Sequence, residues 1–161
     1  MTRALWYLVN HIIFKSNFFN LNGVKIFLLR AFGAQVGKGA VIKPNVNIKY
    51  PWNLRLGDNV WIGECCWIDN LGFVDIGSNS NLSQGAMILT GSHDLKKESF
   101  DLIVRNVFIG ERCWLTSKSI VSPGARLFDG TIVSPGSVVY GETKSNSIYR
   151  GNPATSYKDL H

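Results

Sequence analysis

The sequence predicts an all-β protein, a parallel β-helix, because two regular spacings run through most of the chain. Aliphatic–glycine pairs stand twenty residues apart, and a finer repeat places an aliphatic residue at every sixth position between them. A repeat of fixed period indicates one structural unit stacked upon itself. The pairs are Val36-Gly37, Leu56-Gly57, Ile76-Gly77 and, after a gap, Ile109-Gly110.

A coil with three flat sides explains the six-residue repeat. A short strand points one aliphatic side chain inward, a tight turn follows, and three such sides complete a coil of about eighteen residues. Stacked coils then place aliphatic residues above one another in a continuous core. A β-sandwich is disfavoured, because its strands alternate apolar and polar residues and strict alternation is absent here. The expected core positions are Val36, Ile42, Ile48, Leu56, Ile62, Ile68, Ile76, Leu82, Ile88, Ile109, Leu115, Val121, Leu127, Val133 and Val139.

Residues 1–35 are expected to form an N-terminal helical segment, since apolar residues follow helical spacing over residues 24–32. Terminal units of repeat proteins cover the open end of the stack, which is one role for this segment. Its aromatic and basic residues also suit a membrane surface, so peripheral membrane contact through residues 1–33 is a second role. The apolar stretch 4–14 is too short to span a bilayer.

We assign residues 36–144 to the β-helix and residues 145–161 to a C-terminal tail. The repeat stops over residues 94–106, which carry charge and lack the small residues expected at corners. We therefore expect a loop ejected from a coil there. Loops on a rigid scaffold commonly carry function, so this interruption is the first place to look for a site.

His93 is the candidate general base. A twenty-residue coil places it in the same position as Phe73 one coil earlier, where the chain leaves for the loop. A histidine held there is suited to proton transfer near neutral pH. Asp94, its neighbour, is the candidate to orient the imidazole ring.

Composition limits the remaining classes of function. The chain has 161 residues, enough for one domain, and 45% of them are apolar, which excludes a disordered chain. Only 17% are charged, which suggests that another subunit or a membrane covers part of the surface. Seventeen Lys and Arg against eleven Asp and Glu are scattered, which favours anionic small molecules or lipid headgroups over nucleic acid.

Other catalytic schemes lack the residues they need. No Gly-x-Ser-x-Gly motif supports a hydrolase triad. Cys66 falls at a small-residue corner and Cys65 beside it, so core thiols are favoured over nucleophiles, and the three cysteines (with Cys113) suggest a reducing, cytoplasmic compartment. His11, His93 and His161 are spread from end to end, so no metal site is expected.

Several motifs together resemble the hexapeptide-repeat O-acetyltransferases, and within them the branch for colanic acid and other exopolysaccharide biosynthesis. The resemblance covers essentially the whole chain. It rests on the repeat itself and on four segments: Tyr50-Pro51-Trp52-Asn53-Leu54, Gly91-Ser92-His93-Asp94, Ile109-Gly110-Glu111-Arg112-Cys113-Trp114-Leu115 and Tyr149-Arg150-Gly151-Asn152-Pro153-Ala154.

The resemblance implies a left-handed β-helix that assembles as a homotrimer, with acetyl-coenzyme A in a cleft between two subunits and no metal. It implies that His93 takes the proton from an acceptor hydroxyl while that oxygen attacks the thioester directly, with Trp114 lining the site. Lys118, Lys144 and Arg150 become candidates for the coenzyme phosphates. The pantetheine arm is assigned to Ser117, Pro135, Gly136 and Tyr140.

The expected function is therefore acetyl-coenzyme A-dependent O-acetylation of a sugar hydroxyl in exopolysaccharide or O-antigen biosynthesis. A xenobiotic acetyltransferase that modifies an antibiotic and a non-catalytic β-helix scaffold are the alternatives. Departures from the family bear on the coenzyme, at Ser134-Pro135-Gly136-Ser137 and Tyr140-Gly141 as well as in the coil after the tryptophan. Many relatives carry Gly-Ala-Gly-Ala after the tryptophan, where this chain has Thr116-Ser117-Lys118-Ser119.

Overall fold

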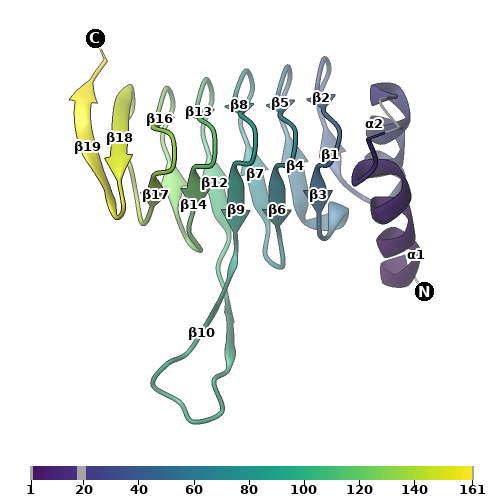
Figure 1. The fold of residues 1–161 in the computed structure, drawn as a ribbon, viewed down its shortest axis with the longest axis horizontal. Coiled ribbons are helices and arrows are strands. Elements are labelled where there is room, and N and C mark those ends of the chain that lie inside the picture. The colour runs from purple at the N-terminus through teal and green to yellow at the C-terminus, as the bar shows by residue number, and fades with distance from the viewer. Residues whose placement is uncertain (1, 18–20, 161) are drawn as a thin grey trace.

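The computed structural model describes residues 2–17 and 21–160, whereas Met1, Phe18–Asn20 and His161 lie outside the described residues. It confirms the predicted left-handed parallel β-helix, with helices at the N-terminal end and one long excursion from the stack (Figure 1). Three parallel sheets form the sides of a prism, and a separate two-stranded sheet forms the excursion.

Each side of the prism is one sheet, and the chain visits the three sheets in turn. Side 1 holds β1 (Gln35–Val36), β4 (Leu54–Leu56), β7 (Val74–Ile76), β12 (Val107–Ile109) and β15 (Arg126–Leu127). Side 2 holds β2 (Val41–Ile42), β5 (Trp61–Ile62), β8 (Asn81–Leu82), β13 (Trp114–Leu115), β16 (Ile132–Val133), β18 (Ser147–Gly151) and β19 (Ala154–Asp159). Side 3 holds β3 (Asn47–Ile48), β6 (Trp67–Asp69), β9 (Met87–Leu89), β14 (Ile120–Val121) and β17 (Val138–Val139).

The strand register confirms the spacing seen in the sequence. Val41 pairs with Trp61 and Trp61 with Asn81, a step of 20 residues per coil, while Trp114 pairs with Ile132, a step of 18. The two extra residues of the early coils lie at the corner between sides 3 and 1, where Pro51–Asn53 form a short 3₁₀ turn. This corner is therefore the widest of the three.

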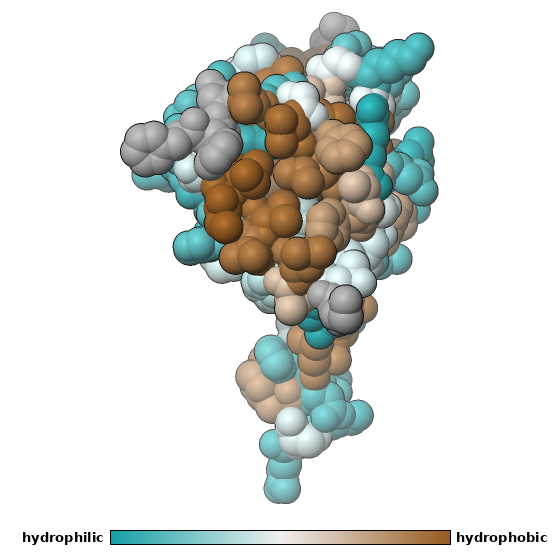
Figure 2. Space-filling model, turned by 90° about the vertical axis from the view of Figure 1, so that its right-hand side faces the viewer, coloured by the Kyte–Doolittle hydropathy of each residue, from teal (hydrophilic) through white to brown (hydrophobic). Residues whose placement is uncertain are grey.

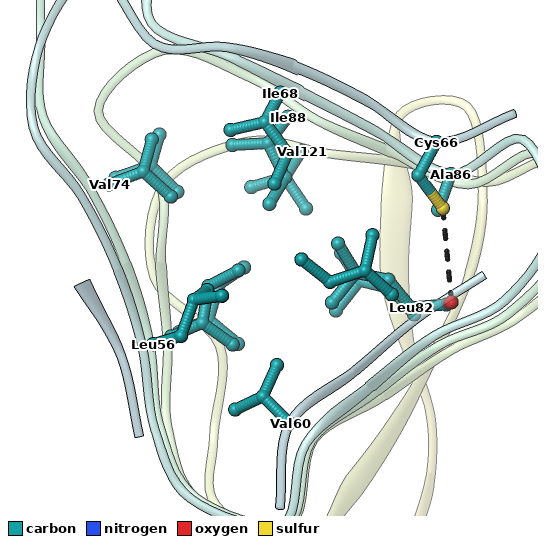
Figure 3. Packing of buried hydrophobic residues seen from close by; sticks show 14 of the residues in the cluster. Leu56, Val60, Cys66, Ile68, Val74, Leu82, Ala86, Ile88 and Val121 are labelled. Carbon is teal, nitrogen blue, oxygen red and sulfur yellow. Dashed lines mark hydrogen bonds between the residues drawn. The ribbon is translucent and has the colours of Figure 1, made fainter. Parts of the chain in front are cut away.

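The aliphatic ladder fills the prism as predicted. Fourteen of the fifteen expected positions are buried, and Val36, in the first coil, is half-buried. Figure 3 shows Ile68, Ile88 and Val121 stacked behind one another on one side of the interior. Burial of this kind stabilises the stack by about 1.5–3 kcal/mol for each large aliphatic side chain.

The N-terminal helices cap the stack, as the sequence predicted. They are α1 (Thr2–Val9), a π-helical turn over Asn10–Phe14 and α2 (Asn22–Ala31). The Trp6 indole N–H donates to the Ile48 carbonyl oxygen at 2.9 Å, and the Lys25 ammonium donates to the carbonyl oxygens of Ile42 and Lys43 at 3.3 and 3.0 Å. These donors satisfy carbonyl groups of the first coil that have no earlier coil to pair with.

Replacing Lys25 by methionine is expected to destabilise the protein by about 2–3 kcal/mol, since two buried carbonyl groups lose their donors. Burial, with a smaller contribution from nearby Lys43, lowers the pKa of Lys25. Between that lowered pKa and the ordinary value of 10.5, the unfolded chain holds a proton that the folded chain does not. The difference in free energy of unfolding between the wild type and Lys25→Met should therefore grow as the pH rises toward 10.5. Urea unfolding across this range measures it, with exposed Lys38→Met as the control; a difference that is flat with pH contradicts the assignment.

The excursion is a hairpin arm and not a bare loop. Its strands β10 (Gly91–His93) and β11 (Leu102–Val104) pair antiparallel, and the Arg105 N–H donates to the Thr90 carbonyl oxygen at 2.8 Å where the arm leaves the prism. The arm projects well away from the stack (Figure 1). The expected loop 94–106 falls within this excursion, whose strand pairing begins at Gly91.

The expectation that His93 occupies the coil position above Phe73 is wrong. The strand after the arm resumes the stack 33 residues on, because Val74 pairs with Val107. Asn106 takes the position above Phe73, and its side-chain oxygen accepts the Phe73 N–H at 2.9 Å. His93 instead lies out on the arm, which moves the candidate base away from the prism wall.

The C-terminal residues extend the prism beyond residue 144, where the sequence analysis ended it. Strand β18 pairs parallel with β16, so Ile132 faces Ile148 as part of side 2. Strand β19 then folds back antiparallel on β18. Over its described residues, the segment 145–161 is thus a hairpin of β18 and β19, and β18 continues side 2 of the prism.

Candidate functional site

His93 lies exposed on the arm with one ring nitrogen engaged. Its Nδ1 is 2.7 Å from the carbonyl oxygen of Phe100, and its ring stacks on the Phe100 ring with centroids 4.5 Å apart. A carbonyl oxygen only accepts hydrogen bonds, so in the neutral imidazole the proton resides on Nδ1. Nε2 then carries a free lone pair, which is the state a general base requires.

The structure does not support the expected role of Asp94. Its carboxylate accepts the Lys96 N–H at 3.0 Å, and its own N–H donates to the Asp101 carbonyl oxygen at 2.9 Å. Both contacts hold the turn of the arm, and the partner of the His93 ring is Phe100. Adjacent residues on a strand point to opposite faces, which explains why a sequence neighbour is poorly placed for the ring.

A shallow cavity of about 270 Å³ lies beside His93 at the corner between sides 3 and 1. Tyr140, which was expected to contact the pantetheine arm, lines this cavity, and its side chain is 59% exposed. Arg105 and Ser122 are also part of it, and the sequence analysis missed both. Arg105 fits because Gly124 has no side chain: a Cβ there would lie 3.1 Å from Arg105 Cδ. The lining residues are Ser92, His93, Ile103, Arg105, Ser122, Pro123 and Tyr140.

Four of the other expected residues gather at a different corner, between sides 2 and 3. Ser117 and Lys118 form the turn of one coil, and Pro135 and Gly136 form the turn of the next. The Gly136 N–H donates to the Ser117 carbonyl oxygen at 3.1 Å, which stacks the two turns. The structure therefore brings these four together, as a group separate from His93.

Lys118 has an unusual backbone conformation for its residue type. Its φ is +58°, in the left-handed region, while the same position holds Gly85 at +69° in the preceding coil and Gly136 at +67° in the following one. A residue with a side chain is less stable in this region by about 1–2 kcal/mol. Cys65 holds φ +59° at the same position two coils before Lys118, so this turn accommodates a residue with a side chain at that cost.

The remaining expected residues lie apart from one another. Trp114 is 46% exposed on side 2, and its indole N–H donates to Ser83 Oγ at 2.8 Å. Lys144 lies beyond the side 1 position of the last coil, with its N–H donating to the Tyr149 hydroxyl at 2.9 Å. The Arg150 guanidinium stacks over the Tyr157 ring at 5.5 Å. A single chain thus does not bring all expected site residues into one pocket.

The cysteines behave as core thiols where they are buried. Burial raises the pKa of the Cys66 thiol to about 11 and that of Cys113 to about 11. Thiols with such values stay protonated at neutral pH and are poor nucleophiles. Cys65 is exposed, and none of the three forms a disulfide.

The described residues contain neither a group of metal ligands nor a membrane-spanning helix. Over residues 2–17 and 21–160, no three His, Cys, Asp or Glu side chains group as metal ligands would. In the same part of the chain, no helix has the length and apolar character needed to cross a membrane.

Comparison with known proteins finds relatives over nearly the full length. No protein-family model matches. The chain is 41% identical over 155 residues to the colanic acid biosynthesis acetyltransferase WcaF of Escherichia coli strain K12, covering 96% of this chain and 85% of that protein. It is 25% identical over 142 residues to the galactoside O-acetyltransferase of the same organism, covering 83% of this chain and 68% of that protein.

A solved structure shares the fold. A hexapeptide-repeat acetyltransferase of Vibrio cholerae O1 biovar eltor, complexed with acetyl-coenzyme A, superposes with a TM-score of 0.89. The match covers 99% of this chain and 87% of that one at 18% sequence identity. At this identity the likeness concerns the fold.

Proposed function

We propose a function from one premise: the chain belongs to the hexapeptide-repeat acetyltransferase family. The proposed reaction is transfer of an acetyl group from acetyl-coenzyme A to a sugar hydroxyl, in the cytoplasm, during assembly of a surface polysaccharide. The observation that carries it is the contact of His93 Nδ1 with the Phe100 carbonyl oxygen, which leaves Nε2 able to accept a proton. The acceptor class is inferred from the relatives named for colanic acid and for galactosides.

The proposed mechanism is direct transfer with His93 as general base. Nε2 takes the proton of the acceptor hydroxyl while that oxygen bonds to the thioester carbonyl carbon. The tetrahedral intermediate then collapses, the C–S bond breaks, and the coenzyme thiolate takes the proton back from His93 Nε2 to leave as the thiol, which restores the base. A positioned base contributes about 10²–10⁴-fold to such a step. The thioester is already activated, so no covalent enzyme intermediate is required.

A homotrimer would complete the site. Within one chain, His93 and Tyr140 lie at one corner of the prism, while Ser117, Lys118 and Gly136 lie at another. A neighbouring subunit placed against side 3 would bring its own corner between sides 2 and 3 next to the arm of the first subunit. Apolar side chains exposed on the arm support such a contact, with Leu95 81%, Phe100 51% and Leu102 55% exposed. We therefore propose three sites per trimer, each between two subunits.

Lys118 is proposed to bind a coenzyme phosphate, which would account for a lysine at a position that favours glycine. Titration calorimetry of the wild type with acetyl-coenzyme A should show one site per chain. Lys118→Gly should weaken that binding about tenfold through loss of a charge-assisted contact, while stabilising the fold by about 1 kcal/mol through relief of backbone strain.

Cys65→Gly is the matched control for Lys118→Gly. Cys65 occupies the same turn position at φ +59°, two coils before Lys118. Its replacement should give the same gain in stability with unchanged coenzyme affinity. Equal affinities for wild type and Lys118→Gly would rule out the phosphate contact, and no heat with wild-type protein would favour a non-catalytic scaffold.

A further inference from the structure

The outer surface of the N-terminal cap is a continuous apolar patch. We call this the cap face and define it by five side chains: Leu5 and Leu8 on α1, Ile12 on the π-helical turn, and Val24 and Phe27 on α2. They are 55%, 57%, 46%, 41% and 68% exposed, respectively. Figure 2 looks onto this end of the molecule and shows one broad apolar area with polar residues around its edge.

The fold does not need these side chains. On the prism side, α1 packs through Trp6, the π-helical turn through Phe14, and α2 through Lys25 and Leu29, all four of them fully buried. The cap face lies on the other side of the same helices. A helix that is apolar on both sides is expected where both sides are covered. The cap face therefore lacks its partner in the isolated chain.

The segment of the chain that carries the cap face is basic, and the first carboxylate after it, Asp58, accepts the Lys38 N–H at 2.7 Å. Eight of the 17 Lys and Arg lie within residues 1–57, and none of the 11 Asp and Glu does, so this segment carries +8 and the rest of the chain −2. Among the described residues, the ion pairs of this segment are Lys49 with Asp69 and Arg55 with Asp75. Lys15 and Lys38 are exposed beside the cap helices, and neither belongs to an ion pair in the described part of the chain.

We propose that the cap face docks on an anionic phospholipid surface. Apolar helical faces rimmed by lysine and arginine bind the headgroup–acyl boundary of a bilayer, and anionic lipids add an attraction for each basic residue. A second copy is a poor occupant, because pairing two cap faces would bring two segments of charge +8 together. The prism axis runs from the cap to the C-terminal end (Figure 1), so docking stands the prism on the membrane with the arm projecting sideways above it.

This inference concerns binding and does not depend on acetyl transfer. Co-sedimentation of the full chain with vesicles of phosphatidylcholine and phosphatidylglycerol tests it, against vesicles of phosphatidylcholine alone. The wild type should bind the anionic vesicles strongly and the neutral vesicles weakly. Leu8→Ser with Phe27→Ser should lower the partition coefficient at least about tenfold. Lys15→Gln with Lys38→Gln should lower it about fivefold per lysine.

Matched variants separate the cap face from general stickiness. Phe128→Ser with Tyr157→Ser removes two exposed apolar side chains away from the cap and the arm, and Lys96→Gln with Lys158→Gln removes two exposed charges elsewhere. Both control pairs should bind anionic vesicles as the wild type does. Equal loss in control and cap-face variants overturns the proposal. If the wild type does not bind anionic vesicles, the proposal is overturned as well. This holds even if the cap face is then found to bind another protein.

Discussion

Replacing His93 by alanine is expected to lower the turnover number for acetyl transfer by about 10²–10⁴-fold. The imidazole is the proposed acceptor of the hydroxyl proton, and alanine leaves that proton without a destination. Alanine also loses the contacts of the imidazole with the Phe100 carbonyl oxygen and ring, but the strand pairing of the arm and the Arg105–Thr90 contact at its base do not involve the imidazole. Coenzyme affinity and oligomeric state should therefore remain those of the wild type.

The measurement is steady-state acetylation of a saccharide acceptor, with coenzyme binding followed separately by calorimetry. Asp94→Ala is the matched control, because it removes a neighbouring side chain whose carboxylate bonds the Lys96 N–H. It should retain turnover within severalfold of the wild type. A near-normal rate for His93→Ala would exclude its role as the base, while a loss confined to Asp94→Ala would restore the orienting role that its contacts argue against.

Replacing Gly77 by alanine is expected to destabilise the protein by about 3 kcal/mol or more, with a fall in Tm of roughly 6–12 °C. A Cβ at Gly77 would lie 2.5 and 2.6 Å from the carbonyl carbon and oxygen of Gly110, and 2.7 Å from the Glu111 nitrogen. All three are backbone atoms of the next coil, held by the ladder, so they cannot move aside as a side-chain tip would. The two coils would have to separate locally.

Gly23→Ala is the control for this substitution. Gly23 lies in α2, and apart from its chain neighbours and the backbone of its own helix nothing lies within 4 Å of the position a Cβ would take. Alanine there should be neutral or stabilise the helix by about 0.5–1 kcal/mol. Thermal and urea unfolding of both variants give the comparison. Similar stabilities would mean that the coils yield easily at this corner and that the glycine spacing has another cause.

The prism could be predicted well from the sequence because every coil is stabilised by the same kind of contact, made by residues at regular spacing. Each coil needs an inward aliphatic residue at a fixed interval, so the pattern of Ile42, Ile62 and Leu82, twenty residues apart, can be recognised without knowledge of the fold. The glycines were located correctly but explained incompletely. Gly77 has no left-handed φ, and its requirement comes from close approach of the next coil. A contact between residues 33 positions apart leaves no periodic trace in the sequence.

The candidate site was predicted in part for the same reason. The interruption of the repeat located the arm, but the antiparallel pairing that makes it a hairpin aligns His93 with Leu102 and brings the Phe100 carbonyl oxygen to the ring. Every residue carries a main-chain carbonyl oxygen, so the sequence does not show which of them bonds the His93 ring. Arg105 and Ser122 meet at the cavity only because the coil closes beneath the arm. Lys118 was noticed as a departure from the family, and its left-handed φ became visible only in the structure.

The two ends of the prism also decide how long the molecule can become. Coils stacked about 4.8 Å apart have the strand geometry of a fibril, and an uncovered end would template further parallel strands. At one end Trp6, Asn22 and Lys25 already occupy backbone groups of the first coil. At the other, β19 runs antiparallel along side 2 and reverses the direction that a new coil would have to follow. Strand addition is thus blocked at both ends of the prism, and loss of the N-terminal helices would open one of them to pairing with another chain.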